Sequence, residues 1–411
     1  MCDSLRVKDI LEKSTYSPFY LTSKKQLTYN FDAYKEALKG LDSAFIGYAV
    51  KANHNLHIMR YLASLGSGAV LVSGNELKTA LIAGFDPSKM VFNGNGKMLH
   101  ELELAVQNNV LVNIDSEFDL EHIIQASKNT GVKARAMLRI NPDVDPKVHA
   151  YVSTGMASSK FGINNALIGD YLKKIKDNST NVELLGVHCH IGSTIKDVTI
   201  FRDAALKMVE FVDMIRGEGF DLQYLNIGGG LGIDYERNGE KIPTPKDLID
   251  TVRDLIIKMK LKLIIEPGRS MVGNTTVFVN KVTGVKSNGT KNFVVVNGSM
   301  SELIRPSLYD TYQHIEVAEP CKGEVKTFDI VGPVCESADF LGKDRELPAP
   351  DEGMSLVVMD AGAYCQAMSS VYNLKLTCPE FWVDGDQLFQ IRNDPDLDQY
   401  LSVYDMEPKK L

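Results

Sequence analysis

Ala44-Phe-Ile-Gly-Tyr-Ala-Val50 is a short apolar run of β-forming residues, and it ends directly at Lys51. Seven further runs of this kind follow, and amphipathic stretches with helical spacing separate them. Eight βα units in a row indicate a (β/α)8 TIM-type barrel, and a doubly wound open sheet is the main alternative. The predicted strands are Ala44–Val50, Ala69–Ser73, Met90–Asn93, Val110–Ile114, Ala134–Ile140, Leu184–His190, Leu222–Ile227 and Leu261–Glu266.

The pattern changes after about residue 274. Apolar runs at Thr276–Val282, Asn292–Val296 and Ser355–Met359 are separated by turn signals such as Asn288-Gly, with few helical stretches between them. We therefore predict a second, mostly β domain, a β-sandwich or Greek-key arrangement, completed by the N-terminal segment around Phe19–Thr28. The expected domain limits are 28–274 for the barrel, and 1–27 with 275–411 for the β domain.

The composition limits the classes of partner. Of the 411 residues, 44% are hydrophobic and 24% are charged, which is typical of a globular protein. The net charge of −8 gives no general attraction to nucleic acid or anionic membranes, and no apolar run approaches the roughly 20 residues of a membrane span. The six cysteines lack a C-x-x-C pair, so we expect a reducing compartment, no disulfide framework and no metal site.

Reactive side chains lie at the ends of the predicted strands. In (β/α)8 barrels the active site forms at the carboxyl ends of the strands, so these residues are expected around one rim. They are Lys51, Arg139, His188 and His190, the glycine run Gly228–Gly232, and Glu266 with Arg269 close behind. Each has an alternative interpretation: a solvated lysine, a metal-binding histidine pair, a tight turn and a structural ion pair. Because Lys51 follows an apolar run, we expect a partly desolvated amine.

Taken together, these residues resemble the pyridoxal-phosphate enzymes of the alanine-racemase fold, and within them the diaminopimelate decarboxylase family, in its plant-type branch. The likeness covers about Tyr20 to Asn373, and its motifs occur in the family order. The matching strings are Tyr48-Ala-Val-Lys51-Ala-Asn53, Lys160-Phe-Gly-Ile163, His188-Cys-His-Ile-Gly-Ser193, Asn226-Ile-Gly-Gly-Gly-Leu-Gly232, Glu266-Pro-Gly-Arg269, Arg305-Pro-Ser-Leu-Tyr309, Cys335-Glu-Ser337 and Asp360-Ala-Gly-Ala-Tyr364.

The resemblance implies a site for pyridoxal 5′-phosphate. Lys51 would hold the cofactor as a Schiff base, Glu266 would pair with its pyridine nitrogen, and His190 would stack on its ring. The carboxylate matters because it keeps that nitrogen protonated, so the ring accepts electrons when CO2 leaves. The phosphate would be surrounded by Ser193, Gly229 or Gly230, Gly268, Arg269 and Tyr364.

The resemblance also implies roles in substrate binding. Arg269, Arg305, Tyr309 and Tyr364 would hold the amino-acid substrate, and an arginine fork suits the carboxylate that is not lost. Cys335 would supply or position the proton that replaces CO2, and Glu336 would recognise a substrate ammonium group. In the family this pair enters from the partner subunit, which implies a homodimer with composite active sites.

The expected function is decarboxylation of meso-2,6-diaminopimelate to L-lysine and CO2, the last step of lysine biosynthesis. Decarboxylation of arginine, ornithine or carboxynorspermidine is the alternative, and a catalytically silent cofactor-binding regulator is a more remote one. Related decarboxylases often carry an aspartate at Val70, so the surroundings of Lys51 are expected to differ here. We expect a cytoplasmic protein, or a protein of the plastid stroma if a transit peptide precedes the native chain.

Overall fold

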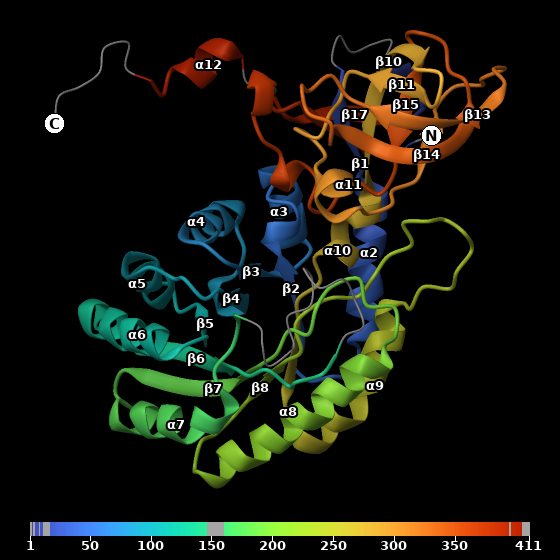
Figure 1. Ribbon diagram of the computed structural model, residues 1–411. Helices are drawn as coiled ribbons and strands as arrows, with labels where there is room; N and C mark the ends of the chain where they lie inside the picture. Colours follow the sequence, from blue (N-terminus) through green and yellow to red (C-terminus); the bar gives the residue numbers. More distant parts are fainter. Residues whose placement is uncertain are drawn as a thin grey trace. The chain divides into compact units, whose positions relative to one another are not determined.

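The computed structural model describes residues 2, 5–7, 9–10, 17–145, 160–393 and 396–404. The chain divides into two compact units (Figure 1). The barrel unit consists of Tyr29–Ile233 and Lys241–Met271, and the sheet unit of Met1–Thr28, Asp234–Glu240 and Val272–Leu411. The segment Asp234–Glu240 interrupts the predicted barrel range because its side chains bond to the sheet unit: Arg237 pairs with Asp360 at 3.2 Å.

The barrel unit is built on eight parallel strands that close on themselves. The first strand pairs with the last, with Phe45 opposite Ile264, so the predicted TIM-type barrel is confirmed and the open sheet is wrong. Its strands are β2 (Phe45–Ala49), β3 (Gly68–Leu71), β4 (Met90–Phe92), β5 (Leu111–Ile114), β6 (Ala134–Arg139), β7 (Val182–His188), β8 (Tyr224–Asn226) and β9 (Lys262–Ile265).

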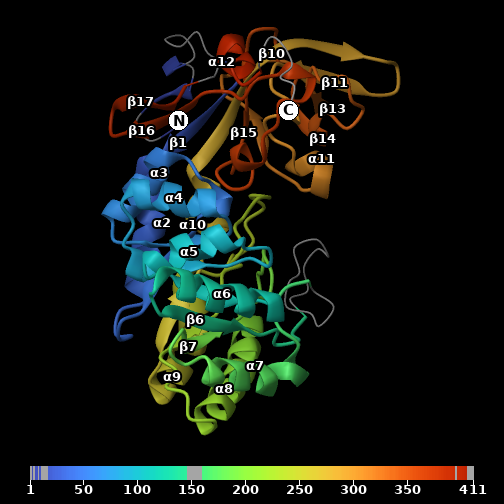
Figure 2. The same cartoon turned by 90° about the vertical axis from the view of Figure 1, so that its left-hand side faces the viewer.

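Helices connect these strands and surround the barrel (Figures 1 and 2). Several begin at a side-chain cap: Ser73 accepts the N–H of Glu76 at 3.2 Å, and Ser116 accepts that of Asp119 at 3.2 Å. The helices are α2 (Lys24–Ala37), α3 (Leu56–Ser64), α4 (Gly74–Ala83), α5 (Leu99–Gln107), α6 (Glu117–Thr130), α7 (Ile168–Asp177), α8 (Thr199–Gly217), α9 (Pro245–Met259) and α10 (Arg269–Val272), with 3-10 turns at η1 (Val50–Ala52), η2 (Pro87–Lys89) and η4 (Asn165–Leu167).

The barrel interior contains an apolar layer, and Val70 is one of the side chains that form it. Side chains from successive strands form this layer, and the buried ones are Val70, Val91, Leu111, Met137, Leu185 and Ile264. Val70 is 4% exposed, so the side chain at the position where the resemblance leads one to expect an aspartate is part of the packed interior. A carboxylate at this depth would be costly to bury without a partner.

The sheet unit contains one connected sheet of nine strands with the main order β14-β13-β11-β10-β1-β16-β17. Its N-terminal strand pairs with β10 antiparallel and with β16 parallel, so the predicted contribution of the N-terminal segment is confirmed. The strand takes up only the first part of that segment, because α2 begins at Lys24. The strands are β1 (Phe19–Ser23), β10 (Thr276–Ser287), β11 (Asn292–Val296), β12 (Ile315–Val317), β13 (Val325–Val331), β14 (Phe340–Pro348), β15 (Ser355–Val358), β16 (Glu380–Asp384) and β17 (Gln387–Arg392).

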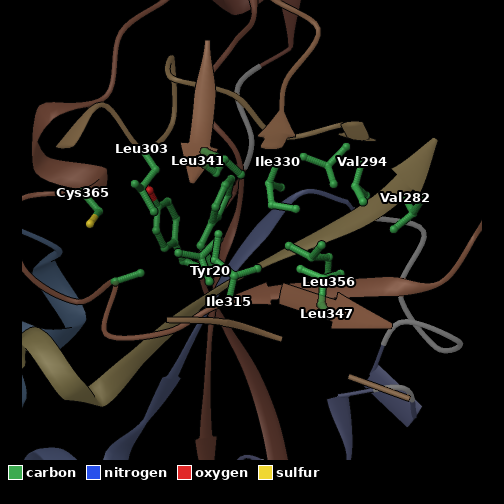
Figure 3. Packing of buried hydrophobic residues seen from close by; sticks show 14 of the residues in the cluster. Tyr20, Val282, Val294, Leu303, Ile315, Ile330, Leu341, Leu347, Leu356 and Cys365 are labelled. Atoms are coloured by element: carbon green, nitrogen blue, oxygen red, sulfur yellow. The ribbon is translucent and has the colours of Figure 1, made fainter. Parts of the chain in front are cut away.

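Both faces of this sheet carry a hydrophobic cluster. Successive side chains of a strand point to opposite faces, and in β1 Tyr20 belongs to one cluster while Phe19 and Leu21 belong to the other. Figure 3 shows most of the first cluster, with Tyr20 among its residues. The Tyr20 ring lies 4.8 Å from the Phe278 ring, and its hydroxyl donates to the Glu302 carbonyl at 2.6 Å. Short helices complete the unit: α11 (Arg305–Tyr309), α12 (Leu397–Leu401), η5 (Gly273–Thr275), η6 (Gln366–Met368) and η7 (Tyr372–Leu374).

No helix within the described residues combines the length and apolar character that a membrane span requires.

Candidate active site

The Glu266 carboxylate lies directly after β9, at the carboxyl end of the barrel, and is 6% exposed. The Asn93 amide donates to both of its oxygens, at 3.0 and 3.2 Å, and the Asn226 amide donates to Oε1 at 2.8 Å. His188 Nε2 lies 3.4 Å from the same Oε1. The strand ends of β4, β7, β8 and β9 therefore converge on one buried acid.

These neighbours keep the acid ionised. Burial by itself raises the pKa of Glu266, but the charges that His188 and His190 carry in acid, together with the Asn93 hydrogen bond, lower it to about 2. Burial also lowers the pKa of His188, and desolvation with the charge of Lys51 holds the pKa of His190 well below its usual value. At neutral pH both imidazoles are therefore uncharged, and neutral donors surround a charged carboxylate.

Lys51 lies in η1, immediately after β2, and its side chain is exposed. The expected partial desolvation of the amine is therefore wrong, because the apolar run before it is buried while the lysine itself extends beyond it. Its positive charge acts on Glu76, a half-buried carboxylate that accepts the Val72 N–H at 2.7 Å. Glu76 thus supplies a negative charge near Lys51. An aspartate was expected to do so at position 70, where this chain has Val70.

His190 is held in one tautomer by the glycine loop. Its Nδ1 accepts the Gly229 N–H at 3.2 Å, which requires an unprotonated Nδ1. A neutral, oriented imidazole is suited to lie flat against an aromatic ring. The stacking of His190 on the cofactor ring stays a prediction. The adjacent Cys189 is buried, and burial raises the pKa of its thiol to about 12. A thiol that stays protonated is a poor metal ligand.

The glycine loop has a shape that only glycine allows. Gly228 and Gly230 have φ of +69° and +121°. A Cβ at Gly229 would lie 2.0 Å from the Glu266 carbonyl oxygen, and one at Gly230 would lie 2.3 Å from the Gly192 oxygen. The Gly228 N–H donates to Asn226 and the Gly229 N–H to His190, whereas the Gly230 N–H has no acceptor among the described residues. Gly230 is therefore the better donor to an anionic ligand.

Arg269 adds a cation to this part of the barrel unit. Its side chain is 7% exposed, and its Nε donates to the Ser193 hydroxyl at 3.2 Å. Gly268 precedes it in the buried turn after β9. A buried guanidinium, a hydroxyl and an open glycine N–H are suitable donors for a phosphate group.

The barrel unit therefore offers the groups that pyridoxal 5′-phosphate requires. These are an accessible amine, an ionised buried carboxylate, a neutral imidazole and a set of anion-binding donors, all at the carboxyl ends of the strands. The glycine loop contributes to the fit because its Gly230 N–H is open to an anion, and a Cβ at Gly229 or Gly230 would collide with main-chain atoms, so only glycine allows this loop conformation. The residues present fit the cofactor.

The sheet unit holds a second group of predicted residues. Arg305 in α11 is 2% exposed, and its Nη1 has no hydrogen-bond acceptor among the described residues. Its guanidinium lies over the Tyr235 ring at 4.6 Å, an aromatic contact that fixes the plane of the fork. A buried guanidinium with an unused N–H is suited to an anion. Tyr309, at the other end of α11, is half-buried.

Cys335 and Glu336 lie on an exposed loop of the same unit. The Asn373 amide oxygen accepts the Cys335 N–H at 2.8 Å, and the Tyr372 hydroxyl donates to Glu336 at 3.4 Å. Asp339 braces the loop by accepting the Val334 N–H at 2.7 Å. Apolar side chains beside it are exposed, namely Val371 (38%), Tyr372 (44%) and Leu374 (62%).

The structure thus brings Lys51, His190, Ser193, Gly229, Gly230, Glu266, Gly268 and Arg269 into the barrel unit, and Arg305, Tyr309, Cys335, Glu336 and Tyr364 into the sheet unit. Tyr364 is half-buried in a turn, with a φ of +59°. Three neighbours were missed from the sequence. Asn93 and Asn226 lie at or next to the ends of predicted strands, and this position was a sequence signal that could have placed them in the site. For Tyr235 the sequence offers no such signal.

Comparisons with known proteins agree on one family. Residues 24–273 match the sequence profile described as pyridoxal-dependent decarboxylase, pyridoxal binding domain. The probable chloroplastic diaminopimelate decarboxylase of Oryza sativa subsp. japonica is 60% identical over 98% of this chain and 83% of that protein. The diaminopimelate decarboxylase of Aquifex aeolicus is 42% identical over 93% of this chain and 90% of that protein.

A solved structure gives the same result for the fold. The crystal structure of diaminopimelate decarboxylase from Helicobacter pylori in complex with L-lysine has a TM-score of 0.92 and 35% sequence identity. The match covers 96% of this chain and 98% of that one. Both units are therefore shared with this structure.

The buried acid generates a prediction about pH. Because the folded pKa of Glu266 is depressed below its ordinary 4.5, its charge stabilises the fold above that pH, and the contribution is lost as the pH falls towards 2. Glu266→Gln should lower the unfolding free energy by on the order of 3 kcal/mol near pH 6, and by progressively less below pH 4.5. Urea unfolding across this range measures the difference. Glu183→Gln, at an exposed position of β7, is the control, and a difference for Glu266→Gln that does not change with pH would contradict the assignment.

Proposed function

We propose that this chain, which belongs to the family of pyridoxal-dependent decarboxylases, is a carboxy-lyase that converts meso-2,6-diaminopimelate to L-lysine and CO2. This reaction is the last step of lysine biosynthesis. The observation that carries the choice of substrate is Arg305, a buried guanidinium with an unused N–H, since a diamino dicarboxylate keeps one carboxylate through the reaction. L-lysine, the ligand in the related Helicobacter pylori structure, has one carboxylate and a distal amine, as the product of such a reaction would.

The cofactor is pyridoxal 5′-phosphate, which supplies an electron-accepting ring when CO2 departs. The Lys51 amine would hold it through its aldehyde carbon, and Glu266 would keep its ring nitrogen protonated by offering an ionised partner. His190, neutral and oriented by Gly229, would lie against the ring face. Ser193, Gly268 and Arg269 would bind the phosphate, with the open N–H of Gly230 favoured over that of Gly229, and Tyr364 would add its hydroxyl.

The substrate would be held by its retained carboxylate and its distal amine. Arg305 offers a planar fork whose paired N–H groups match two carboxylate oxygens, and the Tyr235 ring fixes the plane of that fork. Tyr309 would add a phenol, and Arg269 and Tyr364 would contact the substrate beside the cofactor. The Glu336 carboxylate would accept the distal ammonium group, a role that its exposed position leaves open to a ligand.

Cys335 would deliver the proton that replaces CO2. When the bond between the α-carbon and the departing carboxylate breaks, its electron pair stays on carbon, and the Sγ–H of Cys335 is the proposed source of the proton. The Asn373 side chain holds the main chain of Cys335, and Asp339 braces the loop through Val334. The side chain therefore has a defined main-chain anchor although it is exposed.

A homodimer with composite sites is proposed from the surroundings of Cys335 and Glu336. Both side chains are exposed beside apolar residues that a monomer leaves in water, with Leu374 exposed at 62%. A second copy of the chain covering this surface would bury the apolar side chains and bring the thiol and the carboxylate to its own cofactor. The partners are then one small amino acid and one identical subunit.

Two alternatives remain worth testing. A decarboxylase of arginine, ornithine or carboxynorspermidine would use the same cofactor residues, but an ornithine-type substrate leaves no carboxylate for the buried Arg305. A catalytically silent cofactor-binding regulator would share the fold, yet it would have no need of Lys51 and Cys335 together. For location we propose the cytoplasm, or the plastid stroma if the native chain carries a transit peptide, as the name of the rice relative suggests.

A substrate panel tests the reaction. We expect CO2 release and L-lysine from meso-diaminopimelate, and release at least about a hundredfold slower from L-lysine, ornithine and arginine, because only the first offers a retained carboxylate with a distal amine. Trapping of CO2 together with amino-acid analysis measures both products. Consumption of ornithine or arginine without lysine formation from diaminopimelate would refute the proposed substrate.

Lys51→Ala tests the cofactor attachment. The purified wild-type protein with pyridoxal phosphate should be yellow, and borohydride should bleach it and leave the cofactor mass on the peptide that contains Lys51. The variant should lose the labelled peptide and slow decarboxylation by about 10³-fold or more. Peptide mass spectrometry with a second lysine variant, Lys89→Ala in the turn before β4, provides the control. A label found on another lysine would exclude the assigned role.

Arg305→Met tests the retained-carboxylate site. Removing a charge-assisted fork should raise the KM for diaminopimelate by about 10- to 100-fold, and weaken binding of the product L-lysine by a similar factor, while cofactor binding is unchanged. The matched control is Arg345→Met, which removes another arginine stacked on a tyrosine of the same unit, Tyr312 at 3.8 Å. Equal effects of the two substitutions on KM would indicate a structural role only.

A further inference from the structure

The charge of Glu266 is held by neutral donors on two sides. Asn93 approaches with donor distances of 3.0 and 3.2 Å, and Asn226 with 2.8 Å. The third neighbour, His188, is 3.4 Å away and uncharged at neutral pH, because burial lowers its pKa. Arg139 is also buried nearby, but its ion pair in the barrel unit is with Asp115 at 3.5 Å. The two amides therefore determine where the carboxylate points.

The orientation of the Asn93 amide is itself fixed. Asn93 is 6% exposed, and its Oδ1 accepts a hydrogen bond from the side-chain amide of Asn113, which is fully buried on β5. With the oxygen engaged on that side, the Nδ2 group faces Glu266. The main-chain N–H of Asn93 pairs with the Leu71 carbonyl at 2.8 Å, so the residue is anchored to the barrel as well.

Asn226 supports the same carboxylate from the other side and also the glycine loop. Its Nδ2 donates to Glu266, and its Oδ1 accepts the Gly228 N–H at 2.8 Å. Replacing Asn226 would therefore disturb two features at once, whereas within the described residues no hydrogen bond joins Asn93 to the glycine loop. Asn93 is the position at which the effect on Glu266 can be separated from the effect on anion binding.

We propose that Asn93 is a positioning residue, which acts through Glu266 by holding its carboxylate in line with the ring nitrogen of the bound cofactor. This inference rests on the proposed function, since it requires a nitrogen heterocycle opposite Glu266. It assigns Asn93 no contact with the reacting atoms. Its contribution appears only when the ligand has a ring nitrogen for Glu266 to meet.

This dependence on the ring nitrogen can be tested, because a merely structural role of Asn93 would affect ligands with and without a ring nitrogen equally. Pyridoxal 5′-phosphate and its 1-deaza analogue have the same phosphate and aldehyde, but the analogue has a C–H in place of the ring nitrogen. Titration of the cofactor-free protein with each compound gives two dissociation constants. Leucine is similar in size to asparagine but has no donor. Asn93→Leu should raise the dissociation constant of pyridoxal phosphate by about 10- to 100-fold, and that of the deaza analogue by less than about threefold.

A matched control and a second variant keep the result interpretable. Asn280→Leu removes another fully buried asparagine, in the sheet unit, whose amide donates to the Phe278 carbonyl, and it should leave both constants unchanged. If Asn93→Leu does not fold, Asn93→Asp preserves the shape and places a second carboxylate opposite Glu266, so it should show the same selectivity. Circular dichroism of each variant confirms that it is folded.

The outcomes separate this inference from the function on which it rests. Selective loss of pyridoxal phosphate affinity supports the positioning role. Equal loss for both compounds, or loss for neither, overturns it while the proposed function stands. If the wild-type protein binds pyridoxal phosphate no better than its deaza analogue, Glu266 has no ring nitrogen to pair with, and the role of Glu266 in the proposed function fails first.

Discussion

One buried negative charge organises the barrel unit. Glu266 stands at the end of β9 with no lysine or arginine paired to it among its hydrogen-bond partners in the described chain, and neutral amides from β8 and from the residue after β4 provide its donors. A buried ion without compensation is costly, so these donors must be in place whenever the barrel is closed. The parallel strands meet this requirement because their carboxyl ends converge, which brings Asn93, Asn226 and Glu266 together although 173 positions separate the first from the last.

The choice of amides over cations has a chemical logic. A guanidinium paired with Glu266 would neutralise the charge of the carboxylate and occupy its oxygens. The carboxylate would then attract a protonated ring nitrogen only weakly. Amide N–H groups stabilise the charge without neutralising it, so the carboxylate remains available to a cationic partner. In the sheet unit the opposite arrangement holds: Arg305 keeps an unused N–H and rests on the neutral ring of Tyr235, so that its positive charge remains available to an anion.

The sequence could predict the parts of this fold that depend on apolar patterning. All eight barrel strands were found, because strands of a parallel barrel are buried on both faces and appear as continuous apolar runs. Lys51, His190 and Glu266 could be singled out because reactive residues at strand ends are unusual, and the structure places them after β2, β7 and β9, while their roles stay predictions. Asn93 and Asn226 were passed over for a physical reason: asparagine at the end of a strand ordinarily belongs to a turn, and nothing local reveals a carboxylate far along the chain. The exposure of Lys51 was also beyond reach, since an apolar run before a residue does not determine which way its side chain extends.

The place of β1 in its sheet has a consequence for how the protein is made. This strand lies between β10 and β16, and both partners are synthesised much later: Tyr20 pairs with Phe278, 258 residues further along, and with Glu380, 360 residues further along. On the ribosome, all eight barrel strands are available to one another before β16 has been synthesised. During that interval the edge of β1 that later pairs with β16 has unpaired main-chain groups. Such an edge can pair with other nascent chains. The sheet unit can therefore be completed only after the barrel strands have been synthesised, and pairings of such long sequence separation are intrinsically slow to form.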